Sequence, residues 1–322
     1  MKYVLWESGF EPADAMYREA EKCENVINFK YPFRIKGAAA LYSRLGVGES
    51  IYRHLLVKVD ISRDMEVVFL YFQPWAVFMA QTKVVAYLRK MYPKSIHVVY
   101  LMDVHAARNI DMELLKKSYD KIYIYDKAEA SVLGIDYYPA FYSKNYAKPS
   151  ESEEIYDIAF VGQAKNRYKD IIKMYEKFRS NGLTCHFYIV GVEKKQQKYA
   201  DDIIYADRFI DEEEYFNFYV KSARCLLELT LFQTDAFTAR VREAVIYDKK
   251  LLSNNILLRQ YKFYNSDMMQ VYRDVDDINM DFFRQPKRTY GYTDEFSPLL
   301  FLNELEKQYW IKIKETNSGM LS

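Results

Sequence analysis

The sequence predicts an α/β protein made of two open domains with mostly parallel sheets, and three observations support this. Short apolar or aromatic runs alternate with segments of helical periodicity along almost the whole chain, which is typical of mostly parallel sheets. Most of these runs are continuous, as in strands that are covered on both faces. The chain has 322 residues, and a polar stretch at 143–157 separates two series of such elements.

The elements of the first half follow from these patterns. Apolar and aromatic runs predict strands at 3–6, 26–31, 67–72, 96–102 and 121–126. Helical spacing predicts helices at 37–57, 74–91, 111–119 and 127–133, the last with Asp126 as its N-cap. The most apolar window, 67–81, contains Gln73 and Pro74 and is shorter than the roughly 20 residues of a membrane span. We therefore interpret it as a strand that leads into a helix.

After the polar stretch the same pattern begins again. It predicts strands at 156–162, 184–191, 202–207, 225–231 and 250–253, and an edge strand at 269–273. It predicts helices at 166–181, 211–223 and 236–247, with Asp211 as an N-cap, and an amphipathic helix at 298–315. We expect domains at 1–148 and 156–296, followed by a terminal helical segment at 297–322.

Composition excludes several classes of protein. The 46 basic and 45 acidic residues almost cancel, so we expect no nucleic-acid partner. The three cysteines have no metal-like spacing, and the N-terminal residues lack a signal-peptide pattern, so we expect a cytoplasmic protein. Recognition of a charged ligand must then depend on a local cluster of residues.

One such cluster lies in FVGQAKNRYKD, residues 160–170. We expect the strand to end at Val161, Gly162 to allow a tight turn, and a helix to begin near Asn166. The N–H groups of a helix N-terminus, with Lys165 and Arg167 beside them, would suit a diphosphate. The alternative is an ordinary strand–helix turn with solvated cations.

A second cluster lies in DAFTARVREAVIYDKKLLSNN, residues 235–255. Arginine binds phosphate through two parallel hydrogen bonds, which makes Arg240 and Arg242 candidate ligands. The carboxylate of Glu243 is suited to accept hydrogen bonds from both hydroxyls of a ribose, and Asp235 can reach the same ligand from the preceding loop. The alternative is the solvated face of an amphipathic helix.

Together, YDIAFVGQAKNRYKDI (156–171) and FTARVREAVIYDKKLLSNN (237–255) resemble the nucleotide-binding half of GT-B glycosyltransferases. The similarity is greatest to bacterial enzymes that build lipopolysaccharide cores, capsules and related surface glycans. YLMDVHAARN (100–109) and YDKIYIYDKAEASVLGIDYYPAFY (119–142) resemble the acceptor-side half of the same group. The resemblance implies two facing Rossmann-like domains and a last helix that packs back on the first domain.

The resemblance also implies residue roles. The R-x-x-E-A core of the family corresponds to Arg240, Glu243 and Ala244, so that Arg240 neutralises the donor diphosphate and Glu243 binds ribose. Asp235 stands where many retaining members carry a glutamate, which leaves the stereochemistry open. The full set of expected donor-binding residues is Gly162, Gln163, Lys165, Arg167, Asp235, Thr238, Arg240, Arg242 and Glu243.

An inverting enzyme needs a general base near the acceptor. Asp103 and His105 follow the strand at 96–102, and Glu7 follows the first strand, so these three are the candidate catalytic residues. For His105 the alternative is a structural loop histidine. We expect no metal and no cofactor, because the chain has no metal-ligand motif. The D-x-D letters at 274–277 are interpreted as a helix start.

These observations favour a glycosyltransferase that moves a sugar from a nucleotide sugar to a glycan or lipid-linked saccharide. Contact with the inner face of the cell membrane stays open, because the acceptors of such enzymes are often lipid-linked. Two alternatives remain. One is a catalytically inactive nucleotide- or sugar-binding partner in a polysaccharide assembly complex, and the other is a nucleotide-sugar epimerase of the same outline.

Overall fold

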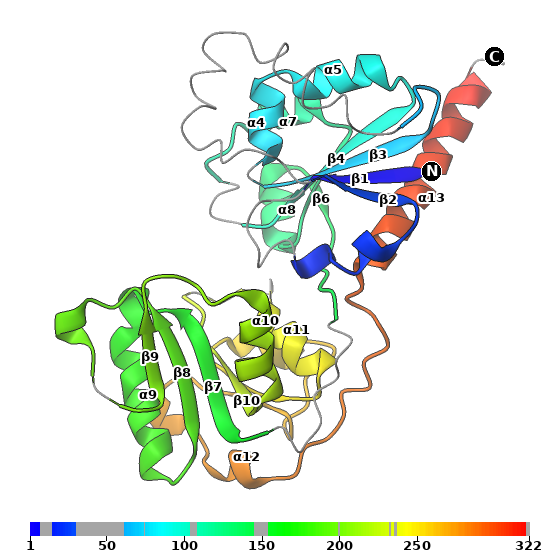
Figure 1. The fold of residues 1–322 in the computed structure, drawn as a ribbon. Helices are drawn as coiled ribbons and strands as arrows, with labels where there is room; N and C mark the ends of the chain where they lie inside the picture. Colours follow the sequence, from blue (N-terminus) through cyan, green and yellow to red (C-terminus); the bar gives the residue numbers. More distant parts are fainter. Residues whose placement is uncertain are drawn as a thin grey trace. The chain divides into compact units, whose positions relative to one another are not determined.

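The chain forms two compact units in the computed structural model (Figure 1). The first unit comprises residues 1–143 and 296–322, and the second comprises residues 144–295. The structure describes residues 1–6, 15–29, 61–73, 75–103, 108–144, 154–198, 200–231, 233–234 and 237–319, with side chains as far as residue 309. The expected helix at 37–57 lies outside the described residues.

The first unit contains a six-stranded parallel sheet in the order β2-β1-β3-β4-β5-β6. All six residues of β3 are buried, which explains its continuous apolar run. The short strand β6 was not predicted. The strands are β1 (Lys2–Trp6), β2 (Val26–Phe29), β3 (Val67–Phe72), β4 (Ser95–Leu101), β5 (Lys121–Ile124) and β6 (Asp136–Tyr137).

The helices of this unit follow the prediction with one correction. The single helix expected at 74–91 is two helices, because Lys83 adopts a left-handed conformation (φ 59°) between them. The Thr82 hydroxyl donates to the Phe78 carbonyl oxygen (2.7 Å) at the end of the first of them. Asp126 caps its helix as expected, and Asp111, which was expected to be the first helical residue, is also an N-cap. The helices are α4 (Trp75–Gln81), α5 (Val84–Met91), α7 (Met112–Ser118) and α8 (Lys127–Leu133), with 3-10 turns at Ala15–Tyr17 and Ala20–Lys22.

The last helix, α13 (Pro298–Gly319), packs on the sheet of the first unit (Figure 1). Phe301, Leu302 and Leu305 belong to a buried cluster with residues of β1, β3 and β4. The Tyr3 hydroxyl donates to the Leu302 carbonyl oxygen at 2.9 Å. The prediction that the last helix packs back on the first domain is therefore confirmed.

The second unit also contains a six-stranded parallel sheet, in the order β12-β11-β10-β7-β8-β9. Counted from β7, this is the strand order 3-2-1-4-5-6 of dinucleotide-binding folds. As predicted, the last strand lies at one edge of the sheet. The strands are β7 (Tyr156–Gln163), β8 (Cys185–Val190), β9 (Ile203–Ala206), β10 (Ala223–Glu228), β11 (Lys250–Ser253) and β12 (Met269–Val271).

Several boundaries in this unit differ from the prediction. β7 extends through Gly162 to Gln163, and β10 ends at Glu228, earlier than expected. A 3-10 turn at Lys165–Arg167 precedes the helix α9 (Tyr168–Ser180). The segment predicted as one helix at 211–223 is α10 (Glu212–Tyr215), capped by Asp211, followed by a π-helix at Phe216–Lys221. The remaining helices are α11 (Ala239–Ile246) and α12 (Asp281–Arg284), with 3-10 turns at Lys194–Gln196, Ile256–Gln260 and Val275–Asp277.

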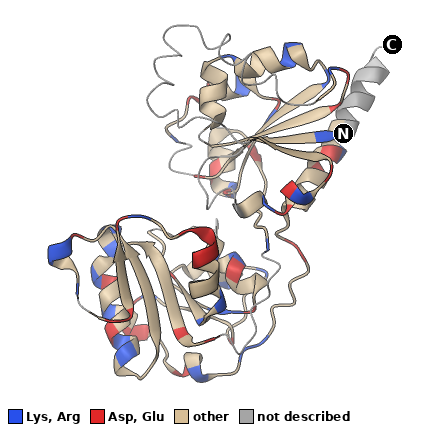
Figure 2. Ribbon diagram, viewed as in Figure 1, with Lys and Arg blue, Asp and Glu red and all other residues tan. Residues whose placement is uncertain are grey.

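Within the part of the chain that is described, no helix has the length and apolar character needed to cross a membrane. Basic and acidic positions are interspersed over both units (Figure 2). A charge-dependent site must therefore be found in a local arrangement of side chains.

Candidate functional site

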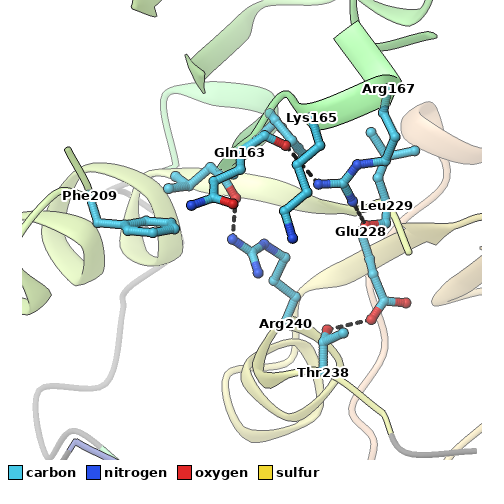
Figure 3. Close-up of a pocket in the computed structure, with 11 residues that line it drawn as sticks. Gln163, Lys165, Arg167, Phe209, Glu228, Leu229, Thr238 and Arg240 are labelled. Carbon is cyan, nitrogen blue, oxygen red and sulfur yellow. Dashed lines mark hydrogen bonds between the residues drawn. The ribbon is translucent and has the colours of Figure 1, made fainter. Parts of the chain in front are cut away.

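A pocket of about 220 Å³ lies at the carboxyl edge of the second sheet, between the neighbouring strands β7 and β10 (Figure 3). The chain leaves β7 toward β8 and β9 on one side and later enters β10 on the other side. Ligands of open α/β sheets bind at this switch point. The pocket is lined by Phe160, Val161, Gly162, Gln163, Lys165, Arg167, Phe209, Glu228, Leu229, Thr238 and Arg240.

Gly162 lies in β7, where it pairs with Ile189 of β8, and not in the tight turn that was expected. A Cβ atom at this position would lie 2.9 Å from Cζ of Phe160, closer than real Cβ contacts allow. The glycine therefore makes room for the aromatic ring two residues earlier.

Two arginines of the pocket donate to backbone carbonyl oxygens, and one of them, Arg167, connects the ends of β7 and β10. Arg167 donates to the carbonyl oxygen of Gln163 (2.7 Å) and to that of Leu229. Arg240 donates to the carbonyl oxygen of Val161. Burial lowers the pKa of Arg167, and the nearby charge of Arg240 lowers it further. The two guanidiniums therefore repel each other, and an anion in the pocket would relieve that repulsion.

Lys165 adds a third cation to the lining. Its side chain is exposed, and its backbone is left-handed (φ 44°). Such a conformation costs a residue with a Cβ about 1–3 kcal/mol and often marks a ligand site. At another side of the pocket, Phe209 is 41 % exposed and presents an aromatic ring (Figure 3).

The sequence interpretation missed Glu228, a buried carboxylate in the pocket wall. Glu228 is the last residue of β10 and is 1 % exposed. It accepts hydrogen bonds from the hydroxyls of Thr238 and Ser253, the latter at 2.5 Å. No local motif marks this glutamate. Its importance comes from the pairing of β10 with β11, in which Glu228 is the partner of Ser253.

Arg242 and Glu243 lie in α11 but do not line the pocket. Arg242 is 7 % and Glu243 is 1 % exposed, so the alternative of a solvated helix face does not describe them. The Tyr215 hydroxyl donates to Glu243 at 2.5 Å. Burial raises the pKa of Tyr215, and the adjacent Glu243 raises it further, so this pair is a fixed hydrogen bond between α10 and α11.

A pair of asparagines holds the loop between β10 and α11. Asn254 accepts from the Thr230 backbone N–H (2.8 Å) and donates to the Thr230 carbonyl oxygen (2.9 Å). Asn255 donates to the Thr234 carbonyl oxygen (2.7 Å), and Gln233 donates to that of Asn254 (2.9 Å). These bonds hold Thr230, Gln233 and Thr234, which are described residues between Glu228 and Thr238.

The expected catalytic residues belong to the first unit. Asp103 is exposed just after β4, and its backbone N–H donates to Oε1 of Gln73 (3.2 Å). Glu7 and His105, as well as the donor-side Asp235, lie outside the described residues. The catalytic assignment of these residues stays a prediction.

Among the described side chains, no group of three or more His, Cys, Asp or Glu is placed to hold a metal ion. The acidic segment at 274–277 is a 3-10 turn that Asp274 caps in a capping box, which confirms its interpretation as a helix start. Lys173 also pairs with Asp274 (3.2 Å) and Asp276 (2.9 Å).

No known protein family matches the chain by sequence, and no curated protein matches it. Several solved structures resemble it in three dimensions. The catalytic domain of starch synthase IV from Arabidopsis thaliana, bound to ADP and acarbose, has a TM-score of 0.53 at 6 % identity, covering 86 % of this chain and 77 % of that one. An alpha-glucosyltransferase in complex with UDP and a 13-mer DNA has a TM-score of 0.50 at 12 % identity, covering 79 % of each chain.

Both similarities extend over both units of the chain. The chain has the GT-B fold. In this GT-B chain, Gly162, Gln163, Lys165, Arg167, Thr238 and Arg240 come together at the pocket of the second unit. A glycosyltransferase from Rickettsia africae is also similar, with a TM-score of 0.48 and 10 % identity, covering 96 % of this chain and 97 % of that one.

Proposed function

We propose that this protein is a glycosyltransferase whose pocket binds the diphosphate of a nucleotide-sugar donor. One observation carries the proposal: Lys165, Arg167 and Arg240 line one pocket at the switch point of the second sheet. Phosphate oxygens can accept from the arginine N–H groups that do not bind carbonyl oxygens, since a guanidinium has five N–H donors.

The same arrangement suits sugar transfer. When the bond between the sugar and the diphosphate breaks, negative charge accumulates on the leaving oxygen. Fixed cations in a partly desolvated pocket stabilise that charge without reorganisation, which lowers the barrier. Phe209 offers an apolar ring beside the charged part of the pocket, where part of the nucleotide or sugar can pack.

We assign the acceptor to glycans or lipid-linked saccharides of bacterial surface polysaccharides, and the base of an inverting reaction to Asp103, His105 or Glu7. The support for the acceptor is the resemblance of the sequence around 100–109 and 119–142 to acceptor-side segments, and the support for the base is that all three candidates follow strands of the first unit. Replacing each of the three residues in turn tests the second assignment: loss of transfer with unchanged donor affinity identifies the base.

The decisive experiment is calorimetry with UDP, GDP, ADP and CDP, followed by a test of donor hydrolysis and transfer. At least one nucleotide should bind, and Arg240→Ala should weaken that binding at least about tenfold, since a charge-assisted hydrogen bond contributes roughly 1.5–3 kcal/mol. Arg240→Lys should restore it only in part, because lysine lacks the planar fork. If the wild type binds a nucleotide and Arg240→Ala weakens that binding, but the wild type shows no donor hydrolysis or transfer, the protein would instead be an inactive binding partner.

A matched control is Arg284→Ala. Arg284 lies in α12 of the same unit, is 61 % exposed, and pairs only loosely with Asp281 (3.3 Å). Its removal should leave nucleotide affinity unchanged. Absence of heat with all four nucleotides would overturn the proposal.

We further propose that turnover needs no divalent metal, because Lys165, Arg167 and Arg240 supply positive charge at the diphosphate. Activity should persist in the presence of a strong chelator. Loss of activity that magnesium or manganese restores would contradict this part of the proposal.

A further inference from the structure

The N-terminus of α11 faces the pocket but lacks the usual side-chain cap. Thr238 occupies the N-cap position with extended backbone angles (φ −71°, ψ 170°), yet its hydroxyl accepts no hydrogen bond from the helix. Threonine is a good N-cap residue. In the same chain, the side chains of Asp111, Asp126 and Asp211 all accept from an N–H of the first turn.

The Thr238 hydroxyl is instead directed to Glu228 (Figure 3). The other oxygen of this carboxylate accepts from Ser253, whose own hydroxyl oxygen accepts from the Asn255 backbone N–H at 3.0 Å. Glu228 is therefore held from two directions, by the end of β11 and by the start of α11. Its orientation fixes the direction in which the Thr238 hydroxyl points.

The charge of Glu228 makes this arrangement unexpected. A carboxylate in the wall of a pocket that binds a diphosphate repels the ligand, and burying it is costly unless it is hydrogen-bonded. On electrostatic grounds alone, the site would bind an anion better without Glu228. The presence of Glu228 is explained if this residue promotes binding of the anionic ligand in a way that does not depend on its own charge.

We propose that Glu228 is a positioning residue that keeps the Thr238 hydroxyl away from the first turn of α11. The backbone N–H groups of that turn have no partner within a helix, and they then stay open for the oxygens of the donor diphosphate. This inference rests on the proposed function, because it requires that the pocket binds a nucleoside diphosphate. It assigns to Glu228 a role that its charge alone would oppose.

A double-mutant cycle tests the inference. In Glu228→Ala the Thr238 hydroxyl is free to cap α11, and it then competes with phosphate, so affinity for the best-binding nucleoside diphosphate should fall by about three- to thirtyfold, the range expected for an N-cap. Thr238→Val cannot cap, and its affinity is the reference level for the double variant. Glu228→Ala/Thr238→Val should recover to the level of Thr238→Val, because no hydroxyl remains to compete.

Two further variants separate charge from hydrogen bonding. Glu228→Gln retains an acceptor for the Thr238 hydroxyl and should bind at least as tightly as the wild type. Thr238→Asn introduces a strong N-cap while Glu228 stays in place, and should weaken binding even though the midpoint of unfolding does not fall. Thr238→Asn also keeps the test valid if Glu228→Ala does not fold. Inorganic pyrophosphate should show the same order of affinities as the nucleotide.

The outcomes are distinct. Tighter binding in Glu228→Ala would show that only the charge matters and would overturn the inference. Equal weakening in Glu228→Ala and in the double variant, with the wild type still binding, would overturn it in favour of a purely structural role. A wild type that binds neither nucleotide nor pyrophosphate would overturn the proposed function itself.

Discussion

Both sheets of this protein are six-stranded and parallel and have a switch point beside their first strand, but they differ in strand order and in the side chains at the switch point. In each unit the chain leaves the first strand, β1 or β7, toward one edge of the sheet, and it later adds its remaining strands on the other side of that first strand. At this edge the second unit presents Lys165, Arg167 and Arg240. At the equivalent edge of the first unit, the described residues include Trp6 and Gln73, and neither is charged.

The polar groups at that edge of the first unit are used differently. Oε1 of Gln73 accepts from the backbone N–H groups of Met102 (3.3 Å) and Asp103 (3.2 Å), which fixes the chain after β4. The one described arginine that soon follows, Arg108, forms an ion pair with the buried Glu129. The fold thus supplies an edge at which a ligand can bind, and the side chains decide which ligand.

Removing the cations from the second unit should eliminate this difference, and we expect the largest effect here. The double variant Arg167→Ala/Arg240→Ala loses two charge-assisted contacts of roughly 1.5–3 kcal/mol each, so nucleotide affinity should fall by about a hundredfold or more. Calorimetry measures the change, and circular dichroism checks the fold. In the first unit, Arg108→Ala should change the affinity by less than about twofold. A comparable loss in Arg108→Ala would contradict the contrast between the units.

A second test separates the stabilities of the two units. His97 is buried in β4, where its ring bonds the hydroxyls of Tyr71 (2.8 Å) and Ser95 (2.9 Å). Burial and, to a smaller extent, the charge of Arg89 lower the pKa of His97 to about 3, although the charge of Asp120 opposes this. The folded state therefore stays neutral while the unfolded state takes up a proton below about pH 6.5.

Folding stability of the first unit should consequently fall by up to about 1.4 kcal/mol for each pH unit as the pH drops from 6.5 toward 3. The three tryptophans, Trp6, Trp75 and Trp310, all belong to the first unit, so tryptophan fluorescence follows its unfolding alone. His97→Gln should remove this dependence of folding stability on pH, whereas His186→Gln in the second unit should leave it unchanged. If the stability of the first unit still falls with pH in His97→Gln, His97 is not the source of the pH dependence.

A third test concerns the loop that the asparagines hold in the second unit. Asn254→Ala loses its bonds to Thr230, and each such bond contributes about 0.5–1.5 kcal/mol. The thermal midpoint should fall by several degrees, and nucleotide affinity should fall several-fold at a temperature where the protein is folded. Asn254→Asp keeps the hydrogen-bond acceptor, so its thermal midpoint and its nucleotide affinity should lie between those of the wild type and those of Asn254→Ala. Reduced stability with unchanged affinity would show that this loop does not position the pocket.

We expect the smallest effect at Lys165. An exposed charge contributes about 0–1 kcal/mol, so Lys165→Ala should weaken nucleotide binding by no more than about fivefold, and less at high salt. Lys165→Gly should lose the same affinity but unfold at a higher temperature than Lys165→Ala, because glycine adopts a left-handed conformation without strain. Equal midpoints for the two variants would show that the backbone at this position is not strained.

The sequence by itself determined the succession of elements. Continuous apolar runs such as 67–72 identified buried parallel strands, because such strands are covered on both faces. Aspartates placed before helical patterns identified N-caps at Asp126 and Asp211, because capping depends only on neighbouring residues. The same local logic identified Arg167 and Arg240 as candidate ligands of an anion, and both line the pocket of the second unit.

Tertiary structure alone decided which of these residues share a pocket. Arg242 and Glu243 occupy the same helix as Arg240, but packing against the sheet and α10 buries them away from the pocket. Glu228 looks like an unremarkable residue of an apolar strand until β11 places Ser253 beside it and α11 brings Thr238 to it. Contacts between residues far apart in the chain depend on strand order and register, and a local pattern contains neither.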